Sequence, residues 1–484
     1  MAVSSAPSGR LSSLRAEWAA VAVAAGSVSL FGAYWDDSWH TDRGRDGALI
    51  PPHLLLYGAV AIAGLVVVGW GVTAWLRGGS LSAVLRQPPL VLAGLGGVTT
   101  LAAAPIDAAW HSAFGRDAVL WSPPHMLAVA GSAMLVVGVV SGAARTRAGV
   151  LEAAAVALLL GSLLVPVLEY ETDVPQFPEV WYPPVLLAGL LVAAAVARTV
   201  LPGRRVVAPA VAVYAVFRLV VIGVLALLGF SVPELPVAVL GLAVVDLPWR
   251  GPALRYSAAG ATICGLALLA AGIGLAGQQP SQIAVAAVPV MIAFTVGALL
   301  TARRGRLLGG GAAVLAAGCL VLASPAPPAS AHDPGQGEIV SGVRIAASSD
   351  GAGRLTMTTE LDGSCTAQAV MLVARRAGSV RRALLASTRA CRFAGSVQVP
   401  DPGRWFVYVE LRDQGHPVEA WLPVNAGRRE TVTADRPLYL PSGDSGRTGG
   451  QLVAAIGLYG GIGLLVGITG WGVRRAARVE GRPG

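Results

Sequence analysis

The feature that most constrains this fold is the recurrence of apolar runs that are each about as long as a bilayer is thick. A transmembrane helix needs about 20 mainly apolar residues, and charged residues make up only 13% of this chain, about half the share usual in a soluble domain. The pattern predicts a polytopic α-helical membrane protein with about twelve transmembrane helices. The predicted spans are 17–35, 54–76, 88–107, 125–144, 149–168, 183–202, 207–230, 233–249, 254–277, 281–302, 307–325 and 449–473.

The arginines predict how these spans are oriented. Loops after even-numbered spans carry arginine clusters, for example Arg145 and Arg147 after the fourth span. Because basic loops stay in the cytoplasm, we expect a multi-pass plasma-membrane protein with both termini cytoplasmic and residues 332–448 outside. The net charge of +9 arises from these loops, so it predicts no nucleic-acid partner. The lipid bilayer is the partner that it indicates.

Residues 332–440 have a different pattern. Segments such as "RLTMTTEL" and "RWFVYVELR" are β-branched or aromatic and partly alternating, and turn residues such as "PDPG" separate them. This predicts an extracytoplasmic β-sandwich before the last helix, with a disulfide between Cys365 and Cys391 or, alternatively, two free thiols. The chain then divides into a duplicated helix-pair metal-binding membrane region (1–148), further transmembrane helices (149–331), the β-sandwich domain (332–448) and a C-terminal helix with a short cytoplasmic tail (449–484).

Two predicted outer loops contain nearly the same polar phrase. "DDSWHTDRGRDGALIPPH" occupies residues 36–53 and "DAAWHSAFGRDAVLWSPPH" occupies residues 107–125, and together they hold four of the six histidines. Each phrase ends one span and begins the next, so the repeated unit is a helix pair. With one inserted residue, the identical positions are Asp36/Asp107, Trp39/Trp110, His40/His111, Gly44/Gly115, Arg45/Arg116, Asp46/Asp117, Pro51/Pro123, Pro52/Pro124 and His53/His125.

The spacing within the first phrase predicts a metal site. Asp36 and His40 are four residues apart, which places them on one face of a helix, and two prolines fix the entry of the next helix just before His53. One carboxylate and two imidazoles form a three-ligand set that suits copper, iron or zinc. The second phrase repeats this set, and its members are Asp107, His111 and His125.

Other polar groups accompany these candidate ligands. Arg45 and Asp46, with their counterparts Arg116 and Asp117, could orient a ligating histidine or form an ion pair across the loop. A network of salt bridges and hydrogen bonds without metal is the alternative for both phrases. Within the apolar runs, Arg218 and Asp246 are the main ionisable residues, and we expect them to pair.

Over residues 17–145, the order of an Asp, Trp-His, Arg-Asp and a histidine after prolines resembles the metal-binding segment of the C subunit of copper membrane monooxygenases, the particulate methane and ammonia monooxygenases. The resemblance implies copper ligands at Asp36, His40 and His53. It implies a second site at Asp107, His111 and His125, where the family has Asn in place of Asp107. Spans five to eleven and the β-domain do not follow from it.

A weaker resemblance concerns the β-domain. "GHPV" before a strand resembles the C-terminal part of CopC, a periplasmic copper carrier built as a β-sandwich that also uses an N-terminal histidine. It implies candidate ligands at Asp413 and His416, although the CopC spacing is one residue shorter, and at His332, which cleavage after "ASA" would make N-terminal. A surface turn and a linker histidine are the alternatives.

These observations predict a copper-binding integral membrane protein with two outward-facing Asp/His/His sites, acting in copper acquisition, storage or delivery. Zinc and iron are not excluded as the metal. The alternative is a copper-dependent membrane monooxygenase, alone or as one subunit. A copper chaperone or partner membrane subunits are the further partners that such functions would require.

Overall fold

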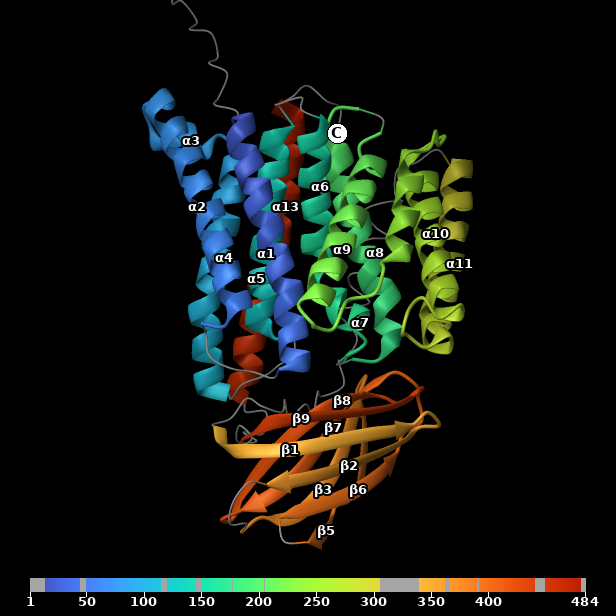
Figure 1. Ribbon diagram of the computed structural model, residues 1–484. Helices are drawn as coiled ribbons and strands as arrows, with labels where there is room; N and C mark the ends of the chain where they lie inside the picture. The colour runs from blue at the N-terminus through green and yellow to red at the C-terminus, as the bar shows by residue number, and fades with distance from the viewer. Residues whose placement is uncertain are drawn as a thin grey trace, which may run out of the picture.

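The computed structural model describes residues 14–43, 49–114, 120–144, 149–175, 177–203, 205–304, 339–361, 366–389, 391–439 and 449–479. Within these ranges, nine helices are long and apolar enough to cross a membrane, so the chain is a polytopic membrane protein. The helices stand side by side in a bundle, and a β-domain lies against one end of it (Figure 1).

The helices vary in length and regularity. Their bounds are α1 Ala16–Asp42, α2 Pro51–Gly78, α3 Leu81–Leu85, α4 Pro88–Phe114, α5 Pro123–Ala143, α6 Gly149–Leu164, η1 Val165–Val167, α7 Leu168–Glu171, η2 Glu179–Trp181, α8 Tyr182–Val200, α9 Ala208–Leu227, η3 Val237–Asp246, α10 Pro252–Gly272, α11 Pro280–Arg304 and α13 Gly449–Val479. Here η marks a 3-10 helix. The C-terminal ends of α1 and α4 and the N-terminal starts of α2 and α5, which belong to the two histidine phrases, lie at the end of the bundle nearer the β-domain (Figure 1).

The predicted span 233–249 differs from the structure. Its apolar residues form the short 3-10 helix η3 rather than a long α-helix. At one end the amide of Glu234 donates to the carbonyl of Glu171 (2.7 Å), and at the other Asp246 binds Arg198 near the end of α8 (3.0 Å). This segment packs mainly against α10. Because a 3-10 helix rises about 2.0 Å per residue against 1.5 Å in an α-helix, it covers a given length with fewer residues than an α-helix does.

Two further predicted spans have different outcomes. The span 281–302 corresponds to the helix α11, of which Pro280–Ile292 forms a shorter apolar stretch among the described residues. The span 307–325 lies outside the described part of the chain. The other predicted spans each coincide with one of the long apolar helices.

The β-domain is a single antiparallel sheet that curls until it is nearly closed. Its strand order is β4-β3-β7-β8-β9-β1-β2-β6-β5, whereas the predicted β-sandwich has two separate sheets. Register shifts in β1 and β3 interrupt the regular pairing, and such bulges bend a sheet. The strands are β1 Ile339–Asp350, β2 Arg354–Leu361, β3 Gln368–Arg376, β4 Ser379–Leu384, β5 Ala386–Arg389, β6 Arg392–Gln398, β7 Arg404–Asp413, β8 His416–Asn425 and β9 Arg429–Tyr439.

A buried arginine joins the β-domain to the bundle. Arg376, at the turn between β3 and β4, binds Asp173 (2.8 Å) and Glu179 (2.6 Å), and its side chain is almost wholly buried. Asp173 also accepts a hydrogen bond from the amide of Arg404 on β7 (2.9 Å). Burial raises the pKa of the Asp173 carboxyl, although Arg376 and Arg404 act to lower it. The two parts therefore meet through a specific polar contact.

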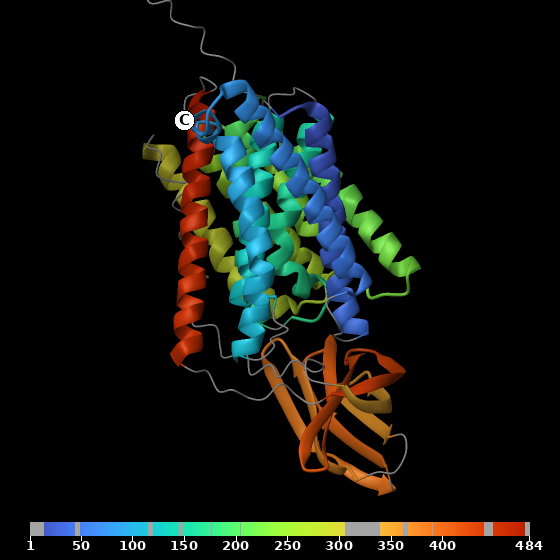
Figure 2. The same cartoon turned by 90° about the vertical axis from the view of Figure 1, so that its left-hand side faces the viewer.

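The C-terminal helix α13 follows the β-domain and runs along the outside of the bundle for its full length (Figure 2). It packs against α4, α5 and α8. Near its end, Gly472 sits so close to Leu92 on α4 that an added Cβ would lie 2.8 Å from it. Most of the other α13 glycines have no atom within 4 Å of the added Cβ position, so this helix is held along a narrow face.

Candidate metal centre

The first histidine phrase brings its three predicted ligands together. His40 lies one turn after Asp36 on α1, and its Nε2 is 3.2 Å from Asp36 Oδ1. His53, in the first turn of α2, places its Nε2 3.0 Å from the same oxygen. One ligand atom from each residue lies within 4.8 Å of the other two. Each side chain is about a quarter exposed, so the group is open to one side and could hold a metal ion.

Local sequence explains this convergence. Four-residue spacing puts Asp36 above His40 on one helix face, and α2 begins with Pro51 and Pro52 at its first two positions. A proline there fixes the backbone dihedral that a helix start requires. His53 follows immediately, and its ring centre is 5.9 Å from that of His40. The chemistry of the set, one carboxylate oxygen and two imidazole nitrogens, suits a borderline transition-metal ion.

A buried arginine holds the opposite face of α1. Arg218 on α9 is fully buried and donates to Tyr34 Oη on α1 (3.0 Å) and to Glu171 Oε2 on α7 (2.5 Å). Its second terminal nitrogen donates to the carbonyl of Glu234 (2.7 Å). Tyr34 lies two residues before Asp36, so this cluster fixes the helix that carries two of the ligands.

The pairing expected for Arg218 is wrong. Arg218 binds Glu171, while Asp246 binds Arg198 and accepts hydrogen bonds from the first amides of α9, those of Val207 and Ala208 (2.8 Å each). A carboxylate suits that place because the free amides of a helix N-terminus carry partial positive charge. Glu171 was missed because it lies just beyond the predicted span 149–168, and nothing in the sequence places that segment against α9.

A second anchor connects α1 to the β-domain. Asp42, in the last turn of α1, accepts hydrogen bonds from Ser231 Oγ (2.6 Å) and Ser231 N (2.5 Å). Arg404 of the β-domain donates to the same hydroxyl (2.8 Å). The end of the ligand-bearing helix is therefore linked to the β-domain through one serine. The sequence contains no signal for this contact, because Asp42, Ser231 and Arg404 are far apart in the chain.

The second phrase reproduces part of the first. Asp107 lies on α4 and His125 in the first turn of α5, and His125 Nε2 is 3.3 Å from Asp107 Oδ1, close to the matching 3.0 Å of the first phrase. Ser122 caps α5 by accepting from the amide of His125 (3.5 Å). The backbone of His111 belongs to α4, but its side chain lies outside the described part of the structure. Two of the three predicted ligands are thus together.

Several predicted residues fall outside the described ranges. They are Arg45, Asp46, Arg116, Asp117, His332 and Cys365. The orienting role of the first four, the role of His332 as a metal ligand and the disulfide all stay predictions. Cys391 is half-buried, and its carbonyl accepts a hydrogen bond from Leu361 (3.0 Å), four residues before Cys365.

The β-domain pair lies at the tip of a hairpin. Asp413 ends β7 and His416 begins β8, and they face each other across a two-residue turn. Gln414 and Gly415 take the positive φ values that such a turn requires. His416 is exposed, and Asp413 accepts a hydrogen bond from Thr366 (2.5 Å). Among the described residues, no third metal ligand joins this pair, and the only group of three is the one at Asp36.

Compared with protein-family models, with curated proteins and with solved structures, the chain has no match.

Proposed function

We propose that this chain is a copper-binding membrane protein that acts in copper acquisition, storage or delivery. The observation that carries the proposal is the convergence of Asp36, His40 and His53 on one point. Asp107 and His125 support a second site of the same kind, with His111 as its third ligand. Among divalent ions, mixed nitrogen and oxygen ligands bind copper most strongly, and the resemblance to the copper membrane monooxygenases also favours copper over zinc or iron.

The three ligands bind the ion directly, and other residues of α1 hold the ligands in position. Asp36 supplies the negative charge, and the two histidines supply neutral nitrogen donors, which must be unprotonated to bind. Tyr34 and Asp42 keep α1 in place on both sides of the ligands. Bound copper would supply a Lewis-acidic and redox-active centre at this end of the bundle. The partly exposed ligands leave a route by which an ion enters and leaves, as a handling role requires.

Metal analysis of purified protein tests this proposal. His40→Ala and His53→Ala should each remove most of one copper equivalent, because two ligands hold an ion much less tightly than three. Ser27→Ala is the matched control on α1, since its hydroxyl only bonds to the carbonyl of Val23 (2.9 Å). Full copper content in both histidine variants would refute the site.

We also propose that the metal sites and the β-domain face outward. They lie at one end of the bundle (Figure 1), and the arginine-rich loops predict that the other end is cytoplasmic. In a chain whose native cysteines are changed to serine, Leu49→Cys should react with an impermeant thiol reagent in intact cells. Ser80→Cys should react only after the cells are opened. The reverse labelling would overturn this orientation.

One observation favours the alternative of a copper-dependent monooxygenase. An apolar cavity begins at Met126, the residue after His125, and could hold an apolar substrate near the second site. Oxygen-dependent oxidation of a small hydrocarbon or of ammonia, lost in His53→Ala or His125→Ala, would replace the handling role by this one. We expect no such oxidation by the chain alone.

A further inference from the structure

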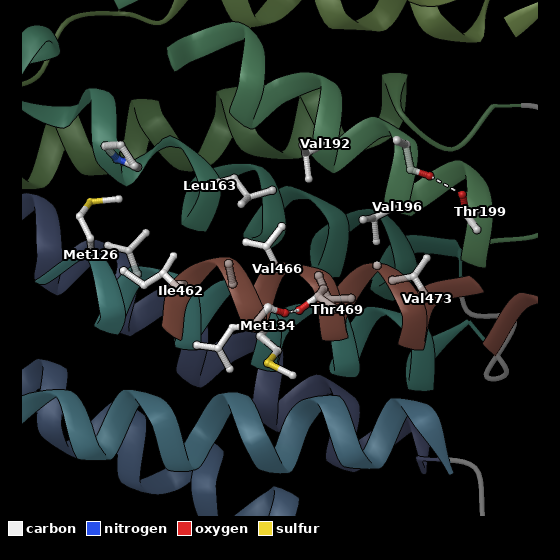
Figure 3. A pocket seen from close by; sticks show the side chains of 18 of the residues that line it. Met126, Met134, Leu163, Val192, Val196, Thr199, Ile462, Val466, Thr469 and Val473 are labelled. Atoms are coloured by element: carbon white, nitrogen blue, oxygen red, sulfur yellow. Dashed lines mark hydrogen bonds between the residues drawn. The ribbon is translucent and has the colours of Figure 1, made fainter. Parts of the chain in front are cut away.

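An apolar cavity of about 450 Å³ lies between one face of α13 and the helices α5 and α8. Figure 3 shows its walls, with Met126 and Ile462 at one end and Thr199 and Val473 at the other. The residues of α5 and of α13 that line it recur every three or four positions, so each helix presents one face. The cavity therefore runs along the helices.

Its dimensions fit one hydrocarbon chain. The lining face of α13 extends from Ile462 to Arg474, which corresponds to about 18 Å at 1.5 Å per residue. One leaflet of a bilayer core is about 15 Å thick. Spread over that length, the volume gives a mean cross-section of roughly 25 Å², whereas a helix is about 10 Å across. A further helix is too wide to enter.

The walls offer almost no polar contact. The two threonine hydroxyls that line the cavity are already used, because Thr199 donates to the carbonyl of Ala195 and Thr469 to that of Leu465 (2.7 Å each; Figure 3). The one charged residue in the lining is Arg474, at the end away from the β-domain. In the part of the chain that the structure describes, no carboxylate pairs with Arg474.

We propose that this cavity binds one acyl chain of an anionic glycerophospholipid whose headgroup contacts Arg474. The apolar walls take the acyl chain, and the Arg474 guanidinium takes the phosphate. The arginine-rich end of the bundle is the predicted cytoplasmic end, where anionic headgroups attract basic residues. The acyl chain fills the cavity between α13, α5 and α8, so it stabilises the packing of the last helix.

Lipid retention by the detergent-purified full chain tests the proposal. After extensive washing, the native chain should keep about one phosphatidylglycerol per molecule, measured by mass spectrometry of the extracted lipid. Val466→Trp fills the cavity from α13 and Ala195→Trp from α8, and each should lose most of that lipid. Leu464→Trp is the control, because Leu464 is exposed on the same helix and does not line the cavity.

The headgroup is tested by adding lipid back to the delipidated chain. Phosphatidylglycerol should raise the melting temperature more than phosphatidylcholine does. Arg474→Gln should lower the ratio of the affinities for phosphatidylglycerol and phosphatidylcholine about fivefold. Arg475→Gln is the control, because Arg475 stacks on Trp471 instead. Equal retention in both tryptophan variants and the native chain would overturn the proposal. So would equal stabilisation of the native chain by both lipids, or stabilisation by oleate alone.

Discussion

The two helix pairs that carry the histidine phrases share their ligands but are held in different ways. In the first pair, Tyr34 and Asp42 anchor α1 by hydrogen bonds to Arg218 and Ser231. At the matching positions α4 has Pro105 and Ala113, which cannot make these bonds. The second pair therefore keeps the ligand positions without the polar anchors of the first.

The second pair is held by close helix packing instead. An added Cβ at Gly138 of α5 would lie 2.6 Å from the carbonyl oxygen of Pro89 on α4, and one at Gly131 would lie 2.8 Å from the amide of Thr100. Small residues allow such close approach of membrane helices. The first pair has Val66 and Ala59 at the corresponding positions. Side-chain anchors on α1 link the first site to the β-domain. The second pair depends mainly on the packing of α4 against α5, and its connecting segment is held by hydrogen bonds from Leu120 N to Glu169 (3.0 Å) and from Tyr459 to the carbonyl of Trp121 (2.7 Å).

The largest effect is expected from removing the central anchor of the first pair. Arg218→Met leaves Glu171 buried without its ion-pair partner, which should cost about 3–5 kcal/mol. We expect a large fall in the melting temperature in detergent. The double variant Arg218→Met/Glu171→Gln should recover part of the loss, because the buried charge is then removed. If Arg218→Met alone melts like the native chain, the cluster does not anchor α1.

The next effect depends on pH and concerns Glu234, whose carbonyl holds Arg218. Burial raises the pKa of its side chain from 4.5 to about 8, and nearby Asp173 adds to this. The folded chain thus keeps a proton that the unfolded chain loses above about pH 4.5. The contribution of protonated Glu234 to the free energy of unfolding is fully present below about pH 4.5. It is lost as the pH rises to about 8.

Glu234→Gln should remove that loss, because glutamine does not ionise. Melting temperatures measured between pH 5 and pH 9 should fall in the native chain and fall less in the variant. Identical slopes would show that Glu234 does not titrate in this range.

A smaller effect is expected from crowding the second pair. Gly138→Ala places a Cβ against the backbone of α4, and such overpacking costs about 1–3 kcal/mol. It should weaken metal binding at the second site and leave the first unchanged. Gly64→Ala on α2 is the control, because its Cβ would meet no atom within 4 Å. If Gly138→Ala weakens metal binding equally at both sites, the two helix pairs are not held independently of each other.

The smallest effect is expected at the contact between α1 and the β-domain. Asp42→Asn keeps one acceptor for Ser231 but removes the charge, which should cost about 1 kcal/mol. The first site should lose affinity by a few-fold and the second should not change. Asp435→Asn is the control, since the ion pair of Asp435 with Arg344 is exposed. If Asp42→Asn leaves the metal affinity of the first site unchanged, the contact with the β-domain does not contribute to metal binding.

The sequence predicted the ligands better than it predicted their support. Asp36, His40 and His53 follow from helix spacing and from prolines that start a helix, which are local properties. The partner of Arg218 could not be found in this way, because Glu171 reaches it only after α7 and α9 pack together.

The fold shows the same division between local and distant information. Long apolar runs predicted most of the helices, because burial in lipid requires them. Apolarity alone does not reveal the rise per residue, so η3 was taken for a full span. Alternation likewise predicted antiparallel strands, whereas the near-closure of the sheet depends on bulges in β1 and β3 that alternation does not reveal.

The measurement that tests the central claim most directly is a competitive copper titration of the native chain, His53→Ala and His125→Ala. The native chain should bind two equivalents, one more tightly than the other, because the anchored first site needs less ordering of its ligands. His53→Ala should lose the tighter equivalent and His125→Ala the weaker one. Loss of the tighter equivalent in His125→Ala, or binding of two unchanged equivalents in both variants, would contradict the account.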